Sequence, residues 1–534
     1  MASGQPAVSH PAASRRPEWV LVPMCLAVML VVGGMTSLNL ALPDIGLALG
    51  ADQAQLQWIV DGYALLLAAL VLPGGALGDR FGRKRMMLIG LGALLAALAW
   101  GARAGNPEEL LGARMLGGAG AALVFPATLS TITAVFPTDR RGLGIAVWAS
   151  AATIGGVVGL IGSGALVESY WWGSVFVATG GVALVTLMLT AAMVPNTSDP
   201  KHAHLDPAGA VLSAAAVGGL VLGVTEGPVR GWSDGLTLAG LAVGVAAAAG
   251  FVRWELRCRR PLLDVRVFAH RGFAAGALVV ATQFFAVFGV MFLTVQYLSF
   301  VLGYGQFASG LALAPLGALC IPGALLAEPL ARRHGRGRAS ALGMAITALG
   351  TMLLIPMSTA SSYWQLGAGL VVISAGFGLA AAPATAAIVG ALPIAKQGVA
   401  SAINDVSREL GGALGIAAMG SAFNGPYRTR IAASGAIPTH LSGLAKDSVA
   451  AGLHAAAGLG QAGGPIASAV RGAFMHGWGI AMTTATASLT ASALVVATRT
   501  PKSADHDLLD ETLDLTEPTA KASMTDLRLG AGAH

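Results

Sequence analysis

The feature that most restricts the fold of this 534-residue chain is a series of apolar stretches, each long enough to cross a membrane. A spanning helix needs about 20 predominantly apolar residues. Because backbone groups in lipid have to be satisfied within their own segment, such stretches predict helices. We place fourteen of them, near residues 19–42, 57–77, 86–103, 110–134, 143–167, 174–194, 207–225, 236–253, 273–300, 310–330, 339–357, 366–392, 400–423 and 474–497. The sequence therefore predicts an all-α polytopic membrane protein.

The composition excludes several classes of protein. Charged residues make up 11% of the chain and hydrophobic residues 55%, whereas soluble domains carry about 25% charged residues. The net charge of +6 is dispersed along the chain, so it does not form the clustered basic face that nucleic acid requires. The three cysteines, Cys25, Cys258 and Cys320, lie far apart and predict neither a disulfide framework nor a zinc site.

Lysine and arginine set the predicted orientation. With the N-terminus inside, twenty-four of them fall in inner segments and six in outer segments, which is a strong positive-inside bias. An even number of spans then places both termini in the cytoplasm and the chain in the inner (cytoplasmic) membrane. We expect a cytoplasmic N-terminal segment over 1–18, a polar external loop over 424–473 and an acidic cytoplasmic tail over 501–534.

A glycine-rich and basic segment follows the second predicted helix. Its glycines have no side chain, so they let another helix approach the end of the second helix closely and they allow a tight turn. Asp79 supplies an acceptor for an arginine or for the N-terminus of a nearby helix. The basic side chains alone could serve only to fix the topology. The residues with the informative spacing are Gly75, Asp79, Arg80, Gly82, Arg83 and Lys84.

This spacing, G-x-x-x-D-R-x-G-R-K, resembles the signature of the major facilitator superfamily. The resemblance implies a major facilitator fold with two six-helix bundles and alternating access. It also implies that these residues form a gate that holds the two halves together on the cytoplasmic side. A weaker form of the pattern, without an acidic residue at the matching place, recurs over 331–336 after the tenth predicted helix.

Further stretches resemble the fourteen-helix drug/proton antiporters of the EmrB/QacA type. These stretches lie at 39–43, 56–63, 205–209, 261–264, 302–304 and 407–415. The resemblance implies two helices inserted between the bundles. We therefore expect an N-terminal bundle over 19–194, the inserted pair over 195–260 and a C-terminal bundle over 261–500.

The fifth predicted helix contains closely spaced small residues that resemble the motif of antiporters. Leu160 and Ser163 stand where the family pattern has proline and glycine. Small residues at this spacing also allow plain close packing against a neighbouring helix, and both interpretations stay open. The glycines in question are Gly155, Gly159, Gly162 and Gly164.

Two charged residues are candidates for proton coupling. Many relatives carry an aspartate in the first helix, but Gly34 occupies that place here. Asp61 and Arg114 lie about a turn inside their helices toward the same outer side, and charges within a membrane are functional by default. Alternatively, Asp61 only positions its helix and Arg114 reaches toward the membrane surface.

The thirteenth predicted helix carries Asp405, Arg408 and Glu409 on adjoining faces. We interpret them as part of the inner gate, and we expect Asp79 to approach the N-terminal end of this helix, where its dipole stabilises a carboxylate. Charges that only neutralise one another near an interface are the alternative.

An apolar substrate cavity could lie toward the centre of the bundles. Runs of aromatic and other apolar residues more often pack against lipid or other helices, so the sequence indicates only the region in which a substrate cavity could lie. Its candidate residues are Met35, Trp148, Gln283, Phe284, Phe288 and Gln296.

Motifs of enzymes and of ATP-driven transport are missing from the sequence, which has no phosphate loop, dinucleotide fingerprint, metal-ligand cluster or nucleophile elbow. We therefore expect that the protein is not an enzyme, that it needs no cofactor or metal, and that a proton gradient is its energy source. The resemblance implies a monomeric exporter of lipophilic drugs whose partners are a small-molecule substrate, protons and the bilayer. Export of a specific metabolite or lipid is one alternative, and a non-transporting sensor or scaffold is another.

Overall fold

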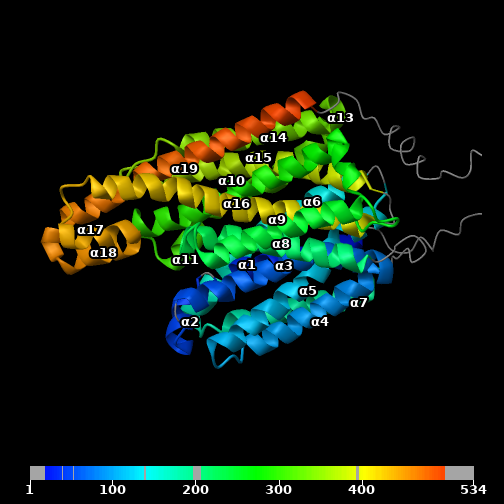
Figure 1. The fold of residues 1–534 in the computed structure, drawn as a ribbon, viewed down its shortest axis with the longest axis horizontal. Coiled ribbons are helices and arrows are strands. Elements are labelled where there is room, and N and C mark those ends of the chain that lie inside the picture. Colours follow the sequence, from blue (N-terminus) through cyan, green and yellow to red (C-terminus); the bar gives the residue numbers. More distant parts are fainter. Residues whose placement is uncertain are drawn as a thin grey trace, which may run out of the picture.

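The computed structural model describes residues 18–38, 40–51, 53–137, 140–195, 206–392 and 396–499. Within these ranges the chain forms helices joined by short connections and contains no strand. Figure 1 shows the long helices running side by side along the molecule. The predicted terminal segments, 1–18 apart from Glu18 and 501–534, lie outside the described residues.

The first half of the molecule consists of six long helices and one short one. Asn106 begins one of the long helices with a side-chain cap, since its Oδ1 accepts a hydrogen bond from the Glu109 N–H at 2.8 Å. The long helices are α1 (Glu18–Thr36), α3 (Gln53–Phe81), α4 (Arg83–Gly101), α5 (Pro107–Val135), α6 (Arg141–Ser169) and α7 (Ser174–Met193), and α2 (Leu42–Leu49) is short.

Two further helices follow as a hairpin. They are α8 (Pro207–Arg230) and α9 (Gly235–Glu255), capped by the side chains of Asp206 and Asp234 respectively. They pack against each other, and α8 also packs along α3 and α16. In Figure 1 the pair lies across the middle of the molecule, between the first half and the helices that come later in the sequence.

The second half again has six spans. They are formed by α10 (Arg271–Phe300), the group α11 (Gln306–Ala312), α12 (Pro315–Ala318) and α13 (Cys320–His334), then α14 (Arg336–Leu354), α15 (Tyr363–Gly390), α16 (Gln397–Ala432) and α19 (Gly464–Arg499). The short helix η1 (Val265–Ala269) precedes α10. Helix α16 packs against α10 and α19 of its own half and against α3, α5 and α8, so it contacts all three parts of the molecule.

The described residues contain thirteen helical segments that are long and apolar enough to cross a membrane. Thirteen of the fourteen predicted stretches correspond to them. The fourteenth, predicted at 400–423, is the 36-residue helix α16, which is long enough but is not apolar enough to meet the same criterion. Because α16 is packed among other helices, it can carry polar side chains that a lipid-facing helix could not.

Two expectations about the second half need correction. The tenth predicted stretch is not one continuous helix, because it is divided into α11, α12 and α13. Pro315 and Pro322 lie in this region, and proline has no N–H to bond to the preceding turn. Such broken helices are tolerated inside a helical bundle, where neighbouring groups satisfy the freed backbone. Here the Leu319 N–H donates to the Ser374 hydroxyl at 3.1 Å.

The region 424–473 is largely helical, and not the loop that its polarity predicted. Helix α16 continues to Ala432, and α17 (Thr439–Asp447), α18 (Val449–Gly458) and η3 (Gly460–Gly463) lead into α19. The Tyr427 hydroxyl donates to the Ala445 carbonyl at 2.6 Å, which fastens α17 to α16. In Figure 1 this helical extension forms the left-hand end of the molecule.

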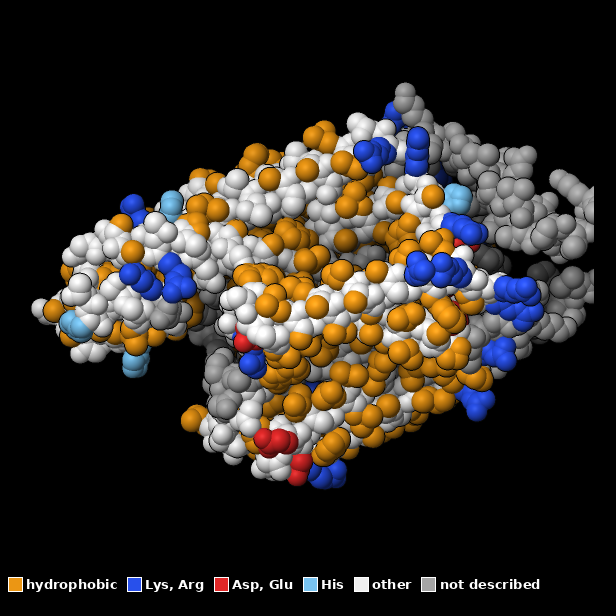
Figure 2. Space-filling view, viewed as in Figure 1, with side chains coloured by type: hydrophobic (Ala, Val, Ile, Leu, Met, Phe, Trp, Pro, Cys, Tyr) orange, Lys and Arg blue, Asp and Glu red, His pale blue; other side chains and the backbone are white. Residues whose placement is uncertain are grey.

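The outer flank of the bundle is apolar. Figure 2 shows hydrophobic side chains over the middle of one face, while Lys and Arg side chains gather toward the ends. Large side chains such as Val177, Leu184 and Met188 on α7 and Val245 on α9 are about half exposed. Such a continuous apolar surface is unfavourable in water and suits contact with lipid.

Candidate functional site

Asp79, near the end of α3, joins the first half of the molecule to the second. Its carboxylate is 3% exposed and accepts hydrogen bonds from two backbone N–H groups in the first turn of α16, those of Gly398 at 2.8 and 2.9 Å and Val399 at 3.2 Å. The helix dipole favours a negative charge at this position. The expected approach of Asp79 to the N-terminus of this helix is therefore observed.

Two glycines bring α3 and α16 into backbone contact beside Asp79. A Cβ atom added to Gly75 would collide with the Gly398 carbonyl, and one added to Gly398 would collide with the Gly75 carbonyl and approach the Asp79 carboxyl carbon to 2.8 Å. Any side chain at either position would therefore separate the two helices. The role of Gly75 in the motif is thus explained by this crossing.

The rest of the motif arranges the turn into α4. Gly82 has a φ of 101°, a conformation that residues with a side chain rarely adopt. Arg83 is 5% exposed; it forms an ion pair with Asp79 at 3.0 Å and donates to the Ser130 carbonyl of α5 at 3.2 Å. Lys84 donates to the Ala191 carbonyl of α7 at 2.7 Å. The basic residues thus tie α4 to other helices of the first half.

Lys396 lies directly before α16 and extends this polar region toward the connection that follows α9. Its ammonium donates to the Pro261 carbonyl at 3.2 Å. Burial lowers the pKa of Lys396, and the nearby carboxylates of Asp264, Glu255 and Asp79 partly oppose that shift. The start of α16 is therefore held both by Asp79 of the first half and by the segment that leaves the inserted pair.

A second contact between the halves lies between α6 and α13. Glu328 of α13 lies against Gly142 in the first turn of α6 and forms an ion pair with Arg332 of its own helix at 3.6 Å. A cavity of about 260 Å³ opens here. It is lined by Arg140, Leu143, Ala146, Ala324, Leu325, Glu328, Pro329 and Arg332.

The charged residues of α16 lie deeper than the inner gate that we expected them to join. Arg408 lies ten residues beyond Gly398, which corresponds to roughly 15 Å along the helix axis. Its guanidinium carbon is 3.9 Å from the ring centre of Phe125 on α5 and 5.3 Å from that of Phe284 on α10. Arg408 therefore stands between aromatic rings from the two halves, a cation–π arrangement.

The two carboxylates beside Arg408 are held differently. Glu409 accepts a hydrogen bond from Arg408 at 3.3 Å and forms an ion pair with it. Asp405 is fully buried; its Oδ1 is 3.4 Å from the Asn404 amide, and its Oδ2 has no hydrogen-bond partner among the described residues. The structure thus separates this charged group from Asp79 and places it in the interior of the bundle.

Asp61 and Arg114 do not meet, although both lie toward the same end of the molecule. Tyr63, which lies against Arg114, and Asp61 are two residues apart on α3, so at 100° per residue their side chains leave the helix about 200° apart. Asp61 instead interacts electrostatically with Glu226 of α8, which is buried and paired with Arg230 at 2.5 Å.

Glu226 is a residue of interest that the sequence analysis missed. It lies just beyond the seventh predicted stretch, 207–225, and was therefore counted with a connection. In the structure α8 continues to Arg230, so Glu226 is inside the helix and 3% exposed. The spacing Glu226 to Arg230, which places opposite charges one helical turn apart, was the available signal.

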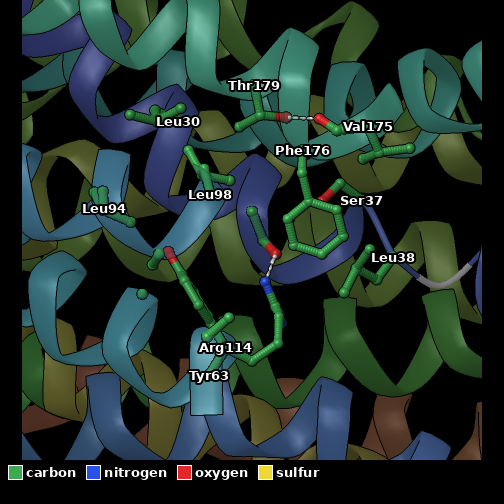
Figure 3. A pocket seen from close by; sticks show the side chains of 14 residues that line it. Leu30, Ser37, Leu38, Tyr63, Leu94, Leu98, Arg114, Val175, Phe176 and Thr179 are labelled. Atoms are coloured by element: carbon green, nitrogen blue, oxygen red, sulfur yellow. Dashed lines mark hydrogen bonds between the residues drawn. The ribbon is translucent and has the colours of Figure 1, made fainter. Parts of the chain in front are cut away.

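Arg114 is buried within the first half. Its Nε donates to the Ile59 carbonyl at 3.0 Å and its Nη1 to the Gly34 carbonyl at 2.9 Å. The guanidinium carbon lies 4.4 Å from the ring centre of Tyr63. Figure 3 shows Arg114 beside Tyr63 at the edge of a cavity that Ser37, Leu38 and Phe176 also line. Arg114 therefore does not reach toward the membrane surface.

The glycines of α6 have unequal surroundings. A Cβ atom on Gly155 would lie 2.5 Å from Met29 Cα, and one on Gly159 would lie 2.6 Å from the Gly33 carbonyl, both on α1. Gly164 faces Leu40 at 2.9 Å, whereas Gly162 has no atom within 4 Å. Close packing of α6 against α1 therefore accounts for Gly155 and Gly159, and nothing in the structure explains Gly162.

The predicted substrate residues do not converge on one cavity. Trp148 lies near Phe125, at 5.9 Å between ring centres, and Phe288 lies near Phe284 at 5.7 Å. These four rings and Arg408 form one continuous group. Met35 packs within the first half and takes no part in it.

Gln283 and Gln296 also lie outside this group. Gln283 is fully buried and donates to the Thr347 hydroxyl of α14 at 3.2 Å. Gln296 is 3.4 Å from the Phe292 carbonyl of its own helix. Thirteen residues separate the two glutamines, which corresponds to a rotation of about 220° on a helix, so they cannot line one face together.

Among the described residues no group of three or more His, Cys, Asp or Glu side chains could hold a metal ion. The polar elements of the site are instead carboxylates and guanidinium groups at helix crossings between the parts of the molecule. A multi-span helical membrane protein whose two six-helix parts meet through such charged crossings has the architecture of a secondary transporter.

The comparison with protein families agrees with this class. The family model described as Major Facilitator Superfamily matches residues 24–416, which is most of the chain, and the protein belongs to this superfamily. Its relatives include "Multidrug efflux pump LfrA" of Mycolicibacterium smegmatis, 33% identical over 84% of this chain and 90% of that protein. "Tetracenomycin C resistance and export protein" of Streptomyces glaucescens is 29% identical over 92% of this chain and 94% of that protein.

Solved structures show the same fold. The human organic anion transporter MFSD10 aligns over 90% of this chain and 100% of its own, with a TM-score of 0.58 at 14% identity. The proton:xylose symporter XylE aligns over 91% of this chain and 96% of its own, with a TM-score of 0.58 at 16% identity. The predicted major facilitator fold is therefore confirmed.

Proposed function

We propose that this protein exports drugs and related lipophilic small molecules across the cytoplasmic membrane in exchange for protons. The observation that carries the proposal is the similarity over most of both chains to efflux and resistance proteins, among them "Multidrug efflux pump LfrA" and "Multidrug resistance protein Stp" of Mycobacterium tuberculosis, which is 32% identical over 72% of this chain and 71% of that protein. No enzymatic step and no cofactor are needed for such exchange, because the proton gradient supplies the energy.

We assign residues 19–194 and 261–500 as the two moving halves and residues 195–260 as the inserted pair. The bias of Lys and Arg toward one side supports a cytoplasmic position for Asp79 and for both termini. In that orientation the contact of Asp79 with α16 is a cytoplasmic gate, and the structure is the state closed on the cytoplasmic side. The protein is proposed to act as a monomer.

Asp61 is the proposed proton-binding group. Its Oδ2 is buried without a hydrogen-bond partner among the described residues, and Glu226 of α8 adds a second carboxylate nearby. A carboxylate inside a bundle of spanning helices is costly while it is charged and unpaired, and such groups mark ion pathways and proton relays. Arg230 neutralises Glu226, so movement of α8 would alter the proton affinity of Asp61.

The proposal can be tested in everted vesicles that are energised by respiration. Adding a transported drug should release protons from the lumen in the wild type. Asp61→Asn should insert normally and lose this release by about a hundredfold or more, which is the usual size of a contribution from a proton-transferring side chain. Glu108→Gln is the matched control, because Glu108 is exposed at the same end of the molecule and bonded to Gln55 of α3 at 2.9 Å. Unchanged proton release by Asp61→Asn would refute its role.

Export of one specific metabolite or lipid is the second candidate function. Gly34 favours it, because the first helix here lacks a carboxylate that could attract a cationic drug. Resistance profiling of an overexpressing strain separates the two: resistance to several unrelated drugs supports the first, and resistance to none supports the second or a non-transporting sensor or scaffold.

A further inference from the structure

The cavity between α6 and α13 is lined by more positive than negative charge. Arg140, directly before α6, belongs to the first half of the molecule, and Arg332, in the last turn of α13, belongs to the second. Of the eight residues that line the cavity, one, Glu328, carries a negative charge. Two guanidinium groups from different halves therefore face one carboxylate.

Both guanidinium groups are accessible and weakly engaged. The Arg140 Nη1 lies 3.3 Å from a carboxylate oxygen of Glu18, and both side chains are well exposed, so this pair contributes little. The Arg332 Nε lies 3.6 Å from Glu328, which is longer than a hydrogen bond. Among the described residues these contacts engage one nitrogen of each guanidinium group, and each group has five N–H donors. Both can therefore donate to a ligand in the cavity.

The deeper part of the cavity is apolar and opens toward the outside of the bundle. Ala146 and Ala324 line it and are buried, while Leu143 and Leu325 border it and are about half exposed. Ala146 lies six residues beyond Arg140, which corresponds to about 9 Å along α6. The cavity thus has charged groups at the helix ends and an apolar surface farther into the bundle.

The size and position of the cavity suit a molecule that arrives from the lipid. Its volume is about 260 Å³, which holds roughly twenty waters at about 10–15 Å³ each on this scale. The inserted helix α8 packs on α3 and α16 and so lies beside the other crossing of the two halves. At the α6–α13 crossing the half-exposed leucines leave the cavity open on the apolar flank of the molecule.

We propose that this cavity binds an anionic phospholipid, with the phosphate group between Arg140 and Arg332 and an acyl chain against Leu143 and Leu325. Guanidinium groups match the geometry of phosphate, and basic pockets between spanning helices bind anionic headgroups. A free phosphate ion would satisfy the charges but would leave the apolar part of the cavity without a partner. Because the two arginines belong to different halves, the bound lipid bridges them in the state that the structure shows.

The proposal is tested by titrating the purified full-length protein in non-ionic detergent with phosphatidylglycerol and counting the bound lipids by native mass spectrometry. Phosphatidylcholine with the same chains is the reference, because its choline cation cancels the phosphate charge. An arginine near the membrane surface strengthens binding of an anionic lipid by about fivefold. We therefore expect one site that prefers phosphatidylglycerol by about 25-fold. Equal binding of the two lipids would overturn the proposal.

Substitutions locate the site. Arg140→Gln and Arg332→Gln should each weaken phosphatidylglycerol binding by about fivefold and leave phosphatidylcholine binding unchanged, and together they should abolish the preference. Arg333→Gln is the matched control, because Arg333 is exposed on the same helix turn but does not line the cavity. If Arg333→Gln weakened binding as much as Arg332→Gln, the attraction would be diffuse and the proposal wrong.

Two further measurements distinguish a lipid from a free phosphate ion. Leu325→Asn should weaken the binding of both lipids by about fivefold, because an acyl chain loses apolar contact, whereas unchanged binding would show that the chain does not lie here. Inorganic phosphate should not displace phosphatidylglycerol at equal concentration. Displacement would assign the cavity to the free ion and overturn the proposal. Because the readout is lipid binding, failure here leaves the proposed drug export untouched, and failure of drug export leaves this site in place.

Discussion

The α3–α4 turn and the α13–α14 turn occupy matching places in the two halves, and they contact the other half in different ways. Both contain a glycine with positive φ, Gly82 at 101° and Gly335 at 89°. Three residues before each glycine stands Asp79 in the first half and Arg332 in the second. Asp79 is 3% exposed, whereas the Arg332 side chain is 66% exposed.

The partners of the two turns are also equivalent. Gly398 is the second residue of α16 and Gly142 is the second residue of α6. Asp79 binds the backbone N–H of Gly398, while Glu328, one turn earlier in its helix, lies against Gly142 and leaves the 260 Å³ cavity open beside it. The repeated fold therefore has two crossings on the same side of the molecule: a tightly packed one between α3 and α16, and a loosely packed one between α13 and α6. The tight one resists separation of the halves, so opening should begin at the loose one.

The largest expected effect comes from Asp79→Asn, which keeps the shape of the side chain and removes its charge. Asp79 accepts hydrogen bonds across the halves from the N–H groups of Gly398 and Val399, and a hydrogen bond to a charged group is worth about 1.5–3 kcal/mol. Loss of the charge should therefore lower the population of the closed state by more than about a hundredfold. We expect faster labelling of a Cys introduced by Ser401→Cys, since Ser401 lies in the first turns of α16 and is fully buried, together with loss of drug efflux. Unchanged labelling and efflux would show that Asp79 does not hold the halves together.

An intermediate effect is expected from Gly398→Ala, because the added methyl group would collide with the Gly75 carbonyl. Overpacking costs about 1–3 kcal/mol, which corresponds to a roughly 5- to 150-fold change in the conformational equilibrium. Efflux measurements should show the loss. Gly78→Ala is the matched control on α3, since no atom lies within 4 Å of its added Cβ; equal losses in the two variants would contradict the crossing as the cause.

The smallest effect is expected from Glu328→Gln at the loose crossing. The Glu328 side chain is 35% exposed, and exposed ion pairs contribute about 0–1 kcal/mol. Drug efflux should therefore change by less than about fivefold. If Glu328→Gln impaired efflux as severely as Asp79→Asn, the two crossings would be energetically equal and the comparison would fail.

Much of the fold could be predicted from sequence because lipid imposes a simple rule. Spanning helices are long apolar runs, and the runs near 110–134 and 174–194 reappear as α5 and α7. The break between α11 and α13 and the helices α17 and α18 were not predicted. Prolines are common in spanning helices without breaking them, and the polar 424–473 region folds because it packs on α16 and α19, a contact that local sequence does not reveal.

In the candidate site, too, some features could be predicted from the sequence and others could not. The approach of Asp79 to α16 could be predicted, because a spaced motif and a helix N-terminus are both visible in the sequence. The relation of Asp61 to Glu226 could not, since it depends on which face of α3 the inserted helix α8 covers. The helical phase of Gln283 and Gln296 was available from sequence, and it already argues against placing both in one cavity.

Arg408 imposes a condition on any rocking movement of the two halves. Its guanidinium group lies over the ring of Phe125 in the first half and near that of Phe284 in the second. Separation of the two halves must therefore break one of these cation–π contacts, at a cost of about 0.5–2 kcal/mol. The exposed face of the guanidinium group can then stack against a flat aromatic molecule. A substrate that stacks there would replace the lost cation–π contact as the two halves separate. Binding of the substrate would then favour the opening movement.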